Sequence, residues 1–390
     1  MKKGWEYKKL GEICDFRSGF AFKSNKFTKI GEPIIRISDI QNEEIDDSNL
    51  VYFDPKSYTE DLSKYLIYPD DILIAMSGGT TGKLGINTSN RTFYLNQRVG
   101  VFRENKKYLN HRYLFYYLHT KSEESLKIAA GAAQPNLSTA QIKSFIIPIS
   151  PLSEQQRIVD YLDSTFAKID AMKANAEESL NEAKALFQAS LKEMLEPKEC
   201  TKWGTIGDLF ETYSGGTPTK SNKEYYEGGS IPWLRSGEVC QKEITETEMF
   251  ITEKGLKESS AKYYPENTVV VAMYGATAAQ VGILRIVSTS NQAVCGILPQ
   301  KDFLPEFIYY WFSSIEDKLA AQAQGGAQPN ISQQKIKKVE IPIYSITEQQ
   351  SIVVTLDSLK SKVDRLQANF EKISQECDAL KQAILKQVFE

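Results

Sequence analysis

Polar side chains suited to reading nucleic acid recur at matching places in the two halves of the chain. Arg36 and Arg235 each end a short β-branched run. A guanidinium there could contact a guanine edge through two hydrogen bonds or hold a phosphate. The pairs Asn96-Gln97 and Asn291-Gln292 carry side-chain amides, which suit adenine edges. We therefore predict a nucleic-acid contact at both sets of residues.

A loop of small residues follows a predicted strand in each half. The two sequences are Ser77-Gly78-Gly79-Thr80-Thr81-Gly82-Lys83 and Tyr274-Gly275-Ala276-Thr277. Small residues let backbone amides and hydroxyls approach a phosphate or a groove closely. The candidate DNA contacts are together Arg36, Ser77, Gly78, Thr80, Lys83, Asn96, Gln97, Arg98, Lys220, Trp233, Arg235, Tyr274, Thr277, Asn291 and Gln292.

Each of these residue types also has an ordinary structural role. Asparagine and glutamine cap turns, glycine-rich stretches form common loops, and an arginine can serve an internal ion pair. The sequence leaves both interpretations open for any single residue.

The matching positions belong to an internal repeat. Residues 129–163 align without gaps on residues 323–357, and 19 of the 35 aligned positions are identical. The register extends backward at an offset between 194 and 199, so the chain is one unit used twice. Each unit begins with β-branched runs, Gly/Pro/Asn turns and one amphipathic segment (109–130 or 305–324), which predicts an α+β globule.

The last part of each unit predicts a long helix. Ser153-Glu154-Gln155-Gln156 and Thr347-Glu348-Gln349-Gln350 fit the capping-box pattern of a helix start. Apolar residues then recur at spacings of three and four for about five heptads, which is typical of a coiled coil. The second helix can bury its apolar stripe only by running back along the first. We therefore expect an antiparallel pair with pseudo-two-fold symmetry, rather than the alternative of an exposed dimerisation stalk.

Motifs of catalysis are missing from the sequence. We find no phosphate loop, no GxGxxG after a strand, no HExxH or GxSxG, and no amino-methyltransferase motif. Pro69-Asp70 followed by Glu104-Asn105-Lys106 resembles the acidic set of a metal-dependent nuclease. The second half has Pro265-Glu266 without a matching ExK, so we expect Asp70 and Asp71 to form a polar turn before the strand 72–76.

Composition narrows the class further. The 390 residues are 41% hydrophobic and 25% charged, as in a folded multidomain protein. Five scattered cysteines without a CxxC pair, no apolar span and no signal segment lead us to expect a cytoplasmic protein. His111 and His119 lack metal-ligand spacing, so we expect structural or surface positions.

Net charge is not that of an obvious polyanion binder. The formal charge is −3, and the sequence pI is about 5.8. Residues 1–152 carry 21 basic and 17 acidic groups, whereas residues 153–196 carry 5 and 9. Binding of DNA would therefore depend on local patches or on a partner.

The repeated segments resemble a known family. GAAQPNLS…IKSFIIPISPLSEQQRIV and GGAQPNIS…IKKVEIPIYSITEQQSIV resemble the end of a target-recognition domain and the following helix of Type I restriction-modification specificity subunits. PIIRISDI, PWLRSGEV and the Asn-Gln pairs resemble the recognition-domain core, and the likeness covers essentially the whole chain. The second EQQ follows Ser345-Ile346 where the first follows Pro151-Leu152, a small departure from the family pattern.

The resemblance implies an α+β fold with two repeated α/β target-recognition domains joined by two long helices, which form an antiparallel coiled coil. The implied domains are recognition domain 1 (1–152), a central spacer helix (153–197), recognition domain 2 (198–346) and a C-terminal spacer helix (347–390). Each recognition domain would read one half of a bipartite, asymmetric DNA sequence, and the helices would set the gap between the halves.

The resemblance also implies a DNA-recognition subunit that is non-catalytic by itself. Its partners would be double-stranded DNA, two methyltransferase subunits and, in the full complex, ATP-dependent restriction subunits. This chain would need no cofactor, and S-adenosylmethionine, ATP and magnesium would belong to the partner subunits. Alternatives are a protein-interaction scaffold or the specificity subunit of a related Type II-like restriction-methylation enzyme. The residues predicted to dock partners are Gln134, Asn136, Glu154, Gln155, Gln328, Asn330, Glu348 and Gln349.

Overall fold

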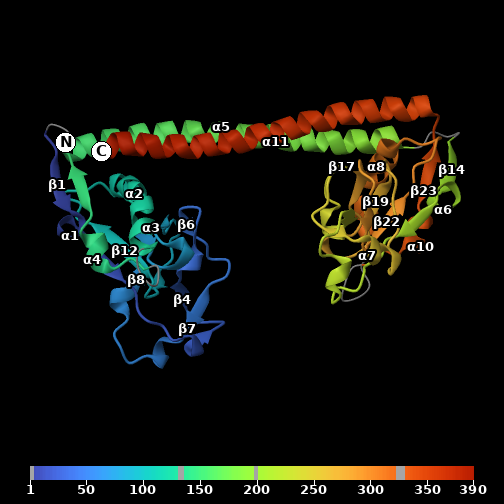
Figure 1. Cartoon of the computed structure of the whole chain (residues 1–390). Coiled ribbons are helices and arrows are strands. Elements are labelled where there is room, and N and C mark those ends of the chain that lie inside the picture. Colours follow the sequence, from blue (N-terminus) through green and yellow to red (C-terminus); the bar gives the residue numbers. More distant parts are fainter. Residues whose placement is uncertain (1–3, 131–135, 197–200, 322–329) are drawn as a thin grey trace. The chain divides into compact units, whose positions relative to one another are not determined.

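The computed structural model describes residues 4–130, 136–196, 201–321 and 330–390 (Figure 1). The chain divides into two compact units, and each unit contains part of both long helices. Unit 1 is Met1–Ala176 with Glu371–Glu390, and unit 2 is Glu177–Phe370.

The described residues of unit 1 form three β-sheets. The largest has the order β2 (Cys14–Ser18), β12 (Val99–Glu104), β9 (Ile72–Ala75), β10 (Leu84–Ile86), β6 (Glu44–Ile45) and β5 (Ile40–Gln41). The second has the order β3 (Phe27–Thr28), β7 (Val51–Phe53), β4 (Glu32–Ile35), β11 (Phe93–Leu95) and β8 (Leu66–Ile67), and β1 (Glu6–Lys9) pairs with β13 (Ile146–Ile149).

Helices cover one face of the large sheet of unit 1. They are α1 (Leu10–Ile13), α2 (His111–Thr120), α3 (Ser122–Ala130), α4 (Thr139–Lys143) and the start of α5 (Leu152–Leu195). Strand β9 is buried on both faces, as its unbroken apolar run requires. Ile72 and Ile74 pack in the core beneath α2, whereas Leu73 and Ala75 pack in a second core with residues of the other sheet.

Unit 2 repeats this plan. Its sheets are β15 (Thr212–Ser214), β22 (Val294–Ile297), β19 (Val269–Ala272), β20 (Val281–Leu284) and β17 (Glu243–Ile244); β18 (Phe250–Ile251), β16 (Ile231–Leu234) and β21 (Thr289–Ser290); and β14 (Lys202–Thr205) with β23 (Glu340–Ile343). Its helices are α6 (Ile206–Leu209), α7 (Glu253–Lys257), α8 (Pro305–Ser314), α9 (Glu316–Ala321), α10 (Gln333–Lys337) and α11 (Ile346–Phe389).

The order of strands confirms the predicted repeat. The strands β2, β12, β9, β10 and β6 have the same order as β15, β22, β19, β20 and β17. In both sheets the last of these pairs is parallel and the others are antiparallel. The α+β prediction is therefore confirmed for both units.

The two long helices pair antiparallel inside each unit. In unit 1, Lys381 Nζ lies 2.6 Å from Asp170 Oδ1, and Lys173 Nζ lies 3.4 Å from Asp378 Oδ1. In unit 2, Leu191 and Leu195 of α5 share a core with residues of the first turns of α11. The seam predicted within one chain is thus confirmed.

The predicted helix caps were wrong in their register. Helix α5 begins at Leu152, and the carbonyl of Pro151 accepts the backbone N–H of Glu154 at 2.8 Å, so Ser153 lies inside the first turn. At α11, Ser345 Oγ accepts the N–H of Glu348, whose carboxylate accepts the N–H of Ser345 at 2.9 Å. Ser345, rather than Thr347, is the cap because Ser345-x-x-Glu348 satisfies the same pattern.

Candidate nucleic-acid interface

Parallel strand pairs bring distant predicted residues together in both units. Strand β4 runs parallel to β11, so the ends that carry Arg36 and Asn96 lie side by side, and Asn96 N donates to Ile35 O at 3.1 Å. Strand β16 runs parallel to β21, and Asn291 N donates to Leu234 O at 2.9 Å beside Arg235. The ends of parallel strands are a common place for binding residues.

In unit 2 these strand ends border a surface hollow of about 460 Å³. Five predicted DNA contacts line it: Lys220, Trp233, Arg235, Asn291 and Gln292. Thr217, Lys223 and Tyr226 line it as well. Burial raises the pKa of Tyr226, so its hydroxyl stays protonated and donates to Pro218 O. The lining also includes the acidic Glu227, and its cationic, amide and hydroxyl groups can contact phosphates and base edges.

Both predicted arginines are paired inside the chain. Arg36 Nη2 lies 3.1 Å from Asp39 Oδ1, and Arg235 Nε lies 3.4 Å from Glu238 Oε2. Arg235 also contacts Glu248 through Nη2. The sequence left an internal ion pair as one possible role of these arginines, and the structure shows that pair at both positions. Arg235 remains 44% exposed at its side chain, against 34% for Arg36, so it is the more accessible of the two.

In each Asn-Gln pair the asparagine has a structural role and the glutamine is exposed. Asn291 Oδ1 accepts the N–H of Ala293 at 3.1 Å, and Asn96 Oδ1 accepts the N–H of Arg98 at 3.5 Å, so both asparagines hold turns. The following Gln97 and Gln292 are exposed. Gln292 Oε1 accepts the hydroxyl of Thr217, which orients the amide. The glutamine is thus the outward member of each pair.

Two predicted contacts are buried, which corrects their assignment as surface contacts. Trp233 is 3% exposed, and its indole N–H donates to Gly216 O at 2.9 Å beneath the hollow. Ser77 is 7% exposed, and its hydroxyl faces the interior. A large aromatic ring at a strand end gains more from core packing than from exposure, which the sequence motif alone does not reveal.

The two loops of small residues form equivalent short turns. Gly78 begins η5 (Gly78–Thr80) with a φ of 74°, and Gly275 begins η8 (Gly275–Thr277) with a φ of 78°, a conformation that favours glycine. Lys83 and Tyr274 are exposed, and Thr80 and Thr277 are half-buried. Lys83 therefore offers a cation beside the loop of unit 1.

Predicted partner-docking residues lie beside these loops. Ser77 forms a β-bridge with Asn136, and Tyr274 forms the equivalent bridge with Asn330. Residues predicted for DNA and for partners therefore adjoin each other in both units. Gln134 and Gln328, also predicted to dock partners, lie outside the described residues.

Gln155 and Gln349 hold helices on globules rather than present a docking surface. Both side chains are 0% exposed. Gln155 Nε2 donates to Tyr108 O and Ser150 O, and its Oε1 accepts from Asn110 N, each at 2.8 Å. Their predicted contact with a partner is therefore corrected. Glu154 and Glu348 remain accessible, although Glu154 pairs with Arg157 at 3.3 Å and Glu348 caps α11.

In each unit an aspartate of a long helix binds side chains of the globule, and the sequence did not predict these contacts. In unit 1, Asp163 of α5 accepts hydrogen bonds from Arg112 and Tyr116 of α2. In unit 2, Asp357 of α11 accepts hydrogen bonds from Lys242 and Tyr310. Burial, followed by the hydrogen bond to the aspartate, raises the pKa of Tyr116 to about 12 and that of Tyr310 further. The repeat offered the signal, because both Asp and Tyr recur at an offset of 194.

The nuclease-like residues form internal pairs. Asp71 Oδ2 lies 2.7 Å from Arg103 Nη2, and Glu104 Oε2 lies 3.2 Å from His111 Nδ1. Burial is the largest single effect and opposes ionisation of Glu104, but the hydrogen bond with His111, a backbone hydrogen bond and the nearby positive charges together outweigh it, and the pKa of Glu104 is lowered. Asp70 has a φ of 65° in the polar turn predicted before β9. Within the described residues, no three His, Cys, Asp or Glu side chains are grouped to hold a metal.

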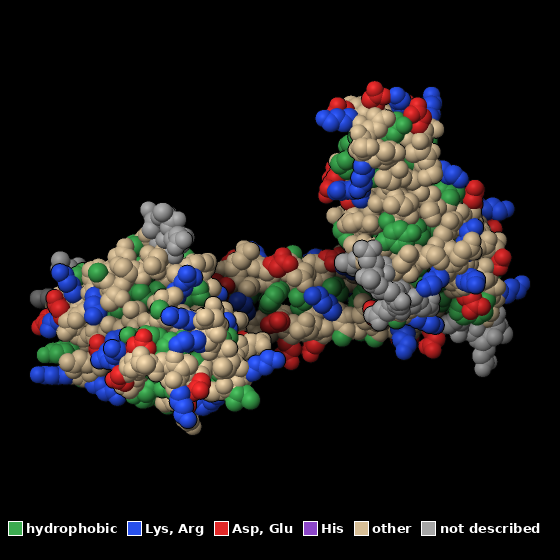
Figure 2. All heavy atoms as spheres, turned by 90° about the horizontal axis from the view of Figure 1, so that it is seen from below, with side chains coloured by type: hydrophobic (Ala, Val, Ile, Leu, Met, Phe, Trp, Pro, Cys, Tyr) green, Lys and Arg blue, Asp and Glu red, His purple; other side chains and the backbone are tan. Residues whose placement is uncertain are grey.

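Charge on the molecular surface is mixed. Figure 2 shows lysine and arginine side chains interspersed with acidic ones on the visible face of each unit. None of the helices in the described ranges is long and apolar enough to cross a membrane.

Comparison with known proteins gives the family. A family model described as the Type I restriction modification DNA specificity domain matches residues 2–182 and again 200–375. The chain therefore belongs to the Type I restriction modification DNA specificity domain family. With two matched domains, it is a specificity subunit with two target-recognition domains, as its resemblance to the family predicted.

Relatives and solved structures agree with this assignment. The chain is 30% identical over 258 residues to the Escherichia coli Type I restriction enzyme EcoR124I/EcoR124II specificity subunit. This match covers 63% of this chain and 62% of that protein, which is less than two thirds of its length. It is 27% identical over 397 residues to the putative type I restriction enzyme MjaX specificity subunit of Methanocaldococcus jannaschii, covering 96% and 91% of the two chains.

The solved structures confirm the fold. A chain of the structure "Structural basis underlying complex assembly and conformational transition of the type I R-M system" matches with a TM-score of 0.79 at 18% identity, covering 100% of this chain and 98% of the other. The HsdS subunit from Thermoanaerobacter tengcongensis matches with a TM-score of 0.59 at 18% identity, covering 99% and 97%.

Proposed function

We propose that each recognition domain reads one half of a bipartite, asymmetric DNA sequence through the residues at its parallel strand ends. The observation that carries this proposal is their duplication: the same two strand ends present Arg36 with Gln97 in unit 1 and Arg235 with Gln292 in unit 2. The rest of the two sites differs, as two different half-sites require. We propose that a protein with this role acts in the cytoplasm.

The long helices and the adjoining surfaces complete this proposal. Two copies of one methyltransferase subunit would dock on the repeated surfaces around Asn136 with Glu154 and Asn330 with Glu348, and restriction subunits would join the full complex. S-adenosylmethionine, ATP and magnesium would be bound by those partners. The accessibility of these four residues supports this arrangement, because Asn136, Asn330 and Glu348 are exposed and the Glu154 side chain is 42% exposed.

The first test replaces one exposed glutamine at a time. We expect Gln292→Ala to relax base preference in one half-site only, and Gln97→Ala in the other, by about 1–3 kcal/mol for the lost amide contact. The purified complex with methyltransferase would be presented with random duplexes, and the selected motifs would be sequenced. Gln350→Ala, an exposed glutamine of α11, is the matched control. Loss of preference in both halves from one substitution would contradict separate reading.

Substitution of the arginines gives a second test of the same sites. Arg235→Ala should weaken one half-site by roughly 1–3 kcal/mol if its guanidinium turns from Glu238 to a guanine. Uniform weakening over all sequences, with a shallower dependence on salt, would make it a phosphate contact. Arg36→Ala removes the cation from the buried Asp39 carboxylate, which keeps only the hydrogen bonds from Ser38 Oγ and the backbone N–H of residue 36, so this variant also needs a thermal unfolding measurement.

We further expect the isolated chain to be non-catalytic. It should neither methylate nor cleave DNA when supplied with S-adenosylmethionine, ATP and magnesium, because neither methyltransferase nor nuclease motifs occur in the sequence. Tritiated methyl transfer and plasmid cleavage would be followed with the partner-free protein. Turnover that copurifies with the chain and scales with its concentration would contradict this expectation.

A further inference from the structure

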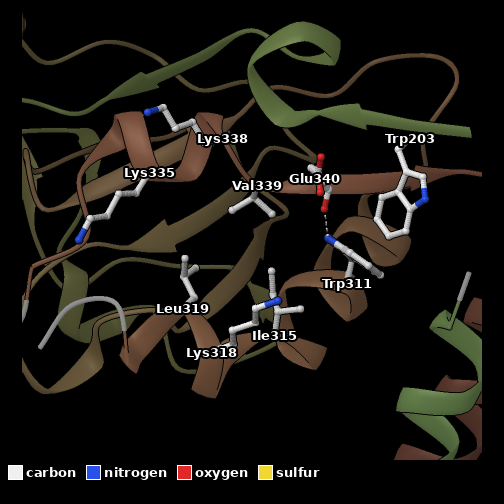
Figure 3. A pocket seen from close by; sticks show the side chains of 9 residues that line it. All are labelled: Trp203, Trp311, Ile315, Lys318, Leu319, Lys335, Lys338, Val339 and Glu340. Atoms are coloured by element: carbon white, nitrogen blue, oxygen red, sulfur yellow. Dashed lines mark hydrogen bonds between the residues drawn. The ribbon is translucent and has the colours of Figure 1, made fainter.

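A second hollow in unit 2 shares no lining residue with the one at the strand ends (Figure 3). It has a volume of about 360 Å³, and its walls include Trp203, Trp311, Ile315, Leu319 and Val339. Trp203 is 44% exposed, and its ring meets that of Trp311 at 5.7 Å between centroids. A large exposed tryptophan beside a buried apolar wall is typical of an anchor position in protein interfaces.

The rim of this hollow is basic. Lys318 of α9, Lys335 of α10 and the adjoining Lys338 line it, and Glu340 is the one acidic residue among its lining side chains. Figure 3 shows Lys335 and Lys338 at one edge of the hollow with their side chains extending outward, Lys318 beside Ile315, and the two tryptophans together on another side. The backbone carbonyl of Glu340 accepts the indole N–H of Trp311 at 2.9 Å, which fixes that ring. An apolar centre with a cationic rim complements an apolar side chain flanked by carboxylates.

The equivalent place in unit 1 is filled. Tyr117 occupies the position equivalent to Trp311. Its hydroxyl donates to Ile146 O at 2.9 Å, as the Trp311 indole N–H donates to the equivalent Glu340 O. The larger Phe145 replaces Val339 and is 5% exposed. Lys121 replaces Ile315, and its Nζ lies 5.9 Å from the centroid of the Phe145 ring.

The three rim lysines of unit 2 have no lysine counterparts in unit 1. The repeat pairs Lys318, Lys335 and Lys338 with Glu124, Gln141 and Ser144. Glu124 is held 2.7 Å from Lys121. The described parts of the two units thus share the backbone plan here, but unit 2 has an apolar hollow with three lysines where unit 1 has Phe145 and Lys121.

We propose that this hollow binds an acidic peptide segment of a partner protein, and that it does so once per chain. One large apolar side chain of the segment enters beside Trp203 and Leu319, and flanking carboxylates meet the lysines of the rim. In duplex DNA the base faces are stacked on one another and the exposed apolar groups are small thymine methyls, so the deep apolar walls favour the larger side chain of a peptide. The proposal is independent of how the strand ends read DNA.

The binding test uses a defined peptide. The full chain, labelled with ¹⁵N in its tryptophans, would be titrated with the acetylated peptide Glu-Asp-Phe-Leu-Asp and, in parallel, with Lys-Lys-Phe-Leu-Lys. We expect the acidic peptide to shift the indole N–H signals of Trp203 and Trp311, with at least tenfold higher affinity than the basic peptide and weaker binding at higher salt. Signals would be assigned with Trp203→Phe. Equal affinity for the two peptides, or an absence of shifts with either, would overturn the proposal.

Unit 1 supplies the variants that should abolish binding. Val339→Phe fills the hollow as Phe145 does, and Lys318→Glu with Lys338→Ser copies the rim. Each should lower the affinity at least tenfold without changing the selected DNA motif. Lys301→Glu, an exposed lysine outside the hollow, should have no effect. The rim variant keeps the test decisive if Val339→Phe fails to fold.

Other occupants would be recognised in the same experiment. A short DNA duplex that shifts the Trp203 signal in place of the peptide would make the rim a DNA contact. A concentration-dependent dimer in sedimentation that protects Trp203 would make the occupant a second copy of this chain. Either result, or retained peptide binding by both unit 1-like variants, would overturn the proposal.

Discussion

Replacing Gln349 by leucine is expected to lower the free energy of unfolding of unit 2 by about 3 kcal/mol or more. The side chain is fully buried, Nε2 donates to Asp302 O at 2.8 Å and Tyr344 O at 2.9 Å, and Oε1 accepts from Leu304 N at 2.8 Å. Leucine has a similar size but leaves three backbone groups unpaired, and each buried unpaired group costs about 1–3 kcal/mol. Urea unfolding followed by tryptophan fluorescence would measure the change, since Trp311 lies in the same core.

Two further variants separate this effect from a general effect of substitution. Gln350→Leu changes the next, exposed residue of α11 and should leave stability within about 0.5 kcal/mol. Gln155→Leu should destabilise unit 1 in the same way, because Gln155 makes the equivalent three bonds. An unchanged midpoint for both Gln349→Leu and Gln155→Leu would show that these glutamines do not hold helix to globule.

Lengthening both long helices by one heptad is expected to change the DNA gap or to abolish bipartite binding. Seven residues inserted after Ala176 and seven after Phe370 fall where the two compact units divide, and they keep the apolar seam in register. The insertion adds about 10 Å of helix, which equals roughly three base pairs. Three base pairs also turn the duplex by about 100°, so loss of binding to the linked sites is as consistent as a longer gap.

Selection from duplexes with varied spacing between the half-sites would measure this outcome. Each half-site should remain readable alone. A seven-residue insertion after Asn90, in an exposed bend between β10 and β11, is the control and should leave the preferred gap unchanged. Full affinity of the lengthened protein for the original gap would show that helix length does not set the spacing.

Features encoded by local pattern were predictable. The repeat follows from identity at a fixed offset, and the long helices follow from apolar spacing at three and four residues. The pairing of the helices follows because neither can bury its stripe alone. Arg36 and Asn96 were predicted as members of one recurring set, but neither their juxtaposition nor the parallel strands that produce it were predicted.

Features that depend on tertiary surroundings were not predictable. Trp233 has the same sequence context whether its ring points outward or beneath the hollow, and only packing decides. Gln155 and Gln349 are polar residues in a helix start, and burial of such residues requires three partners from distant segments. The hollow beside Trp203 arises because Val339 stands where unit 1 has Phe145, a difference that has meaning only once both side chains are placed.

The shared long helices have a consequence for any separated half of the chain. The core of unit 1 is completed by Leu385 and Phe389 of α11, with the Phe389 ring 5.0 Å from that of Tyr113. Leu191 and Leu195 of α5 complete the core of unit 2 and stand at the equivalent positions of the repeat. Each repeat of the sequence therefore carries a core that lacks two apolar side chains and a helix end that could supply equivalent ones. A single repeat produced alone would have an incomplete core, and the helix end of an identical repeat could complete it. The pairing of the long helices is therefore suited to a symmetric, domain-swapped dimer with two identical recognition domains.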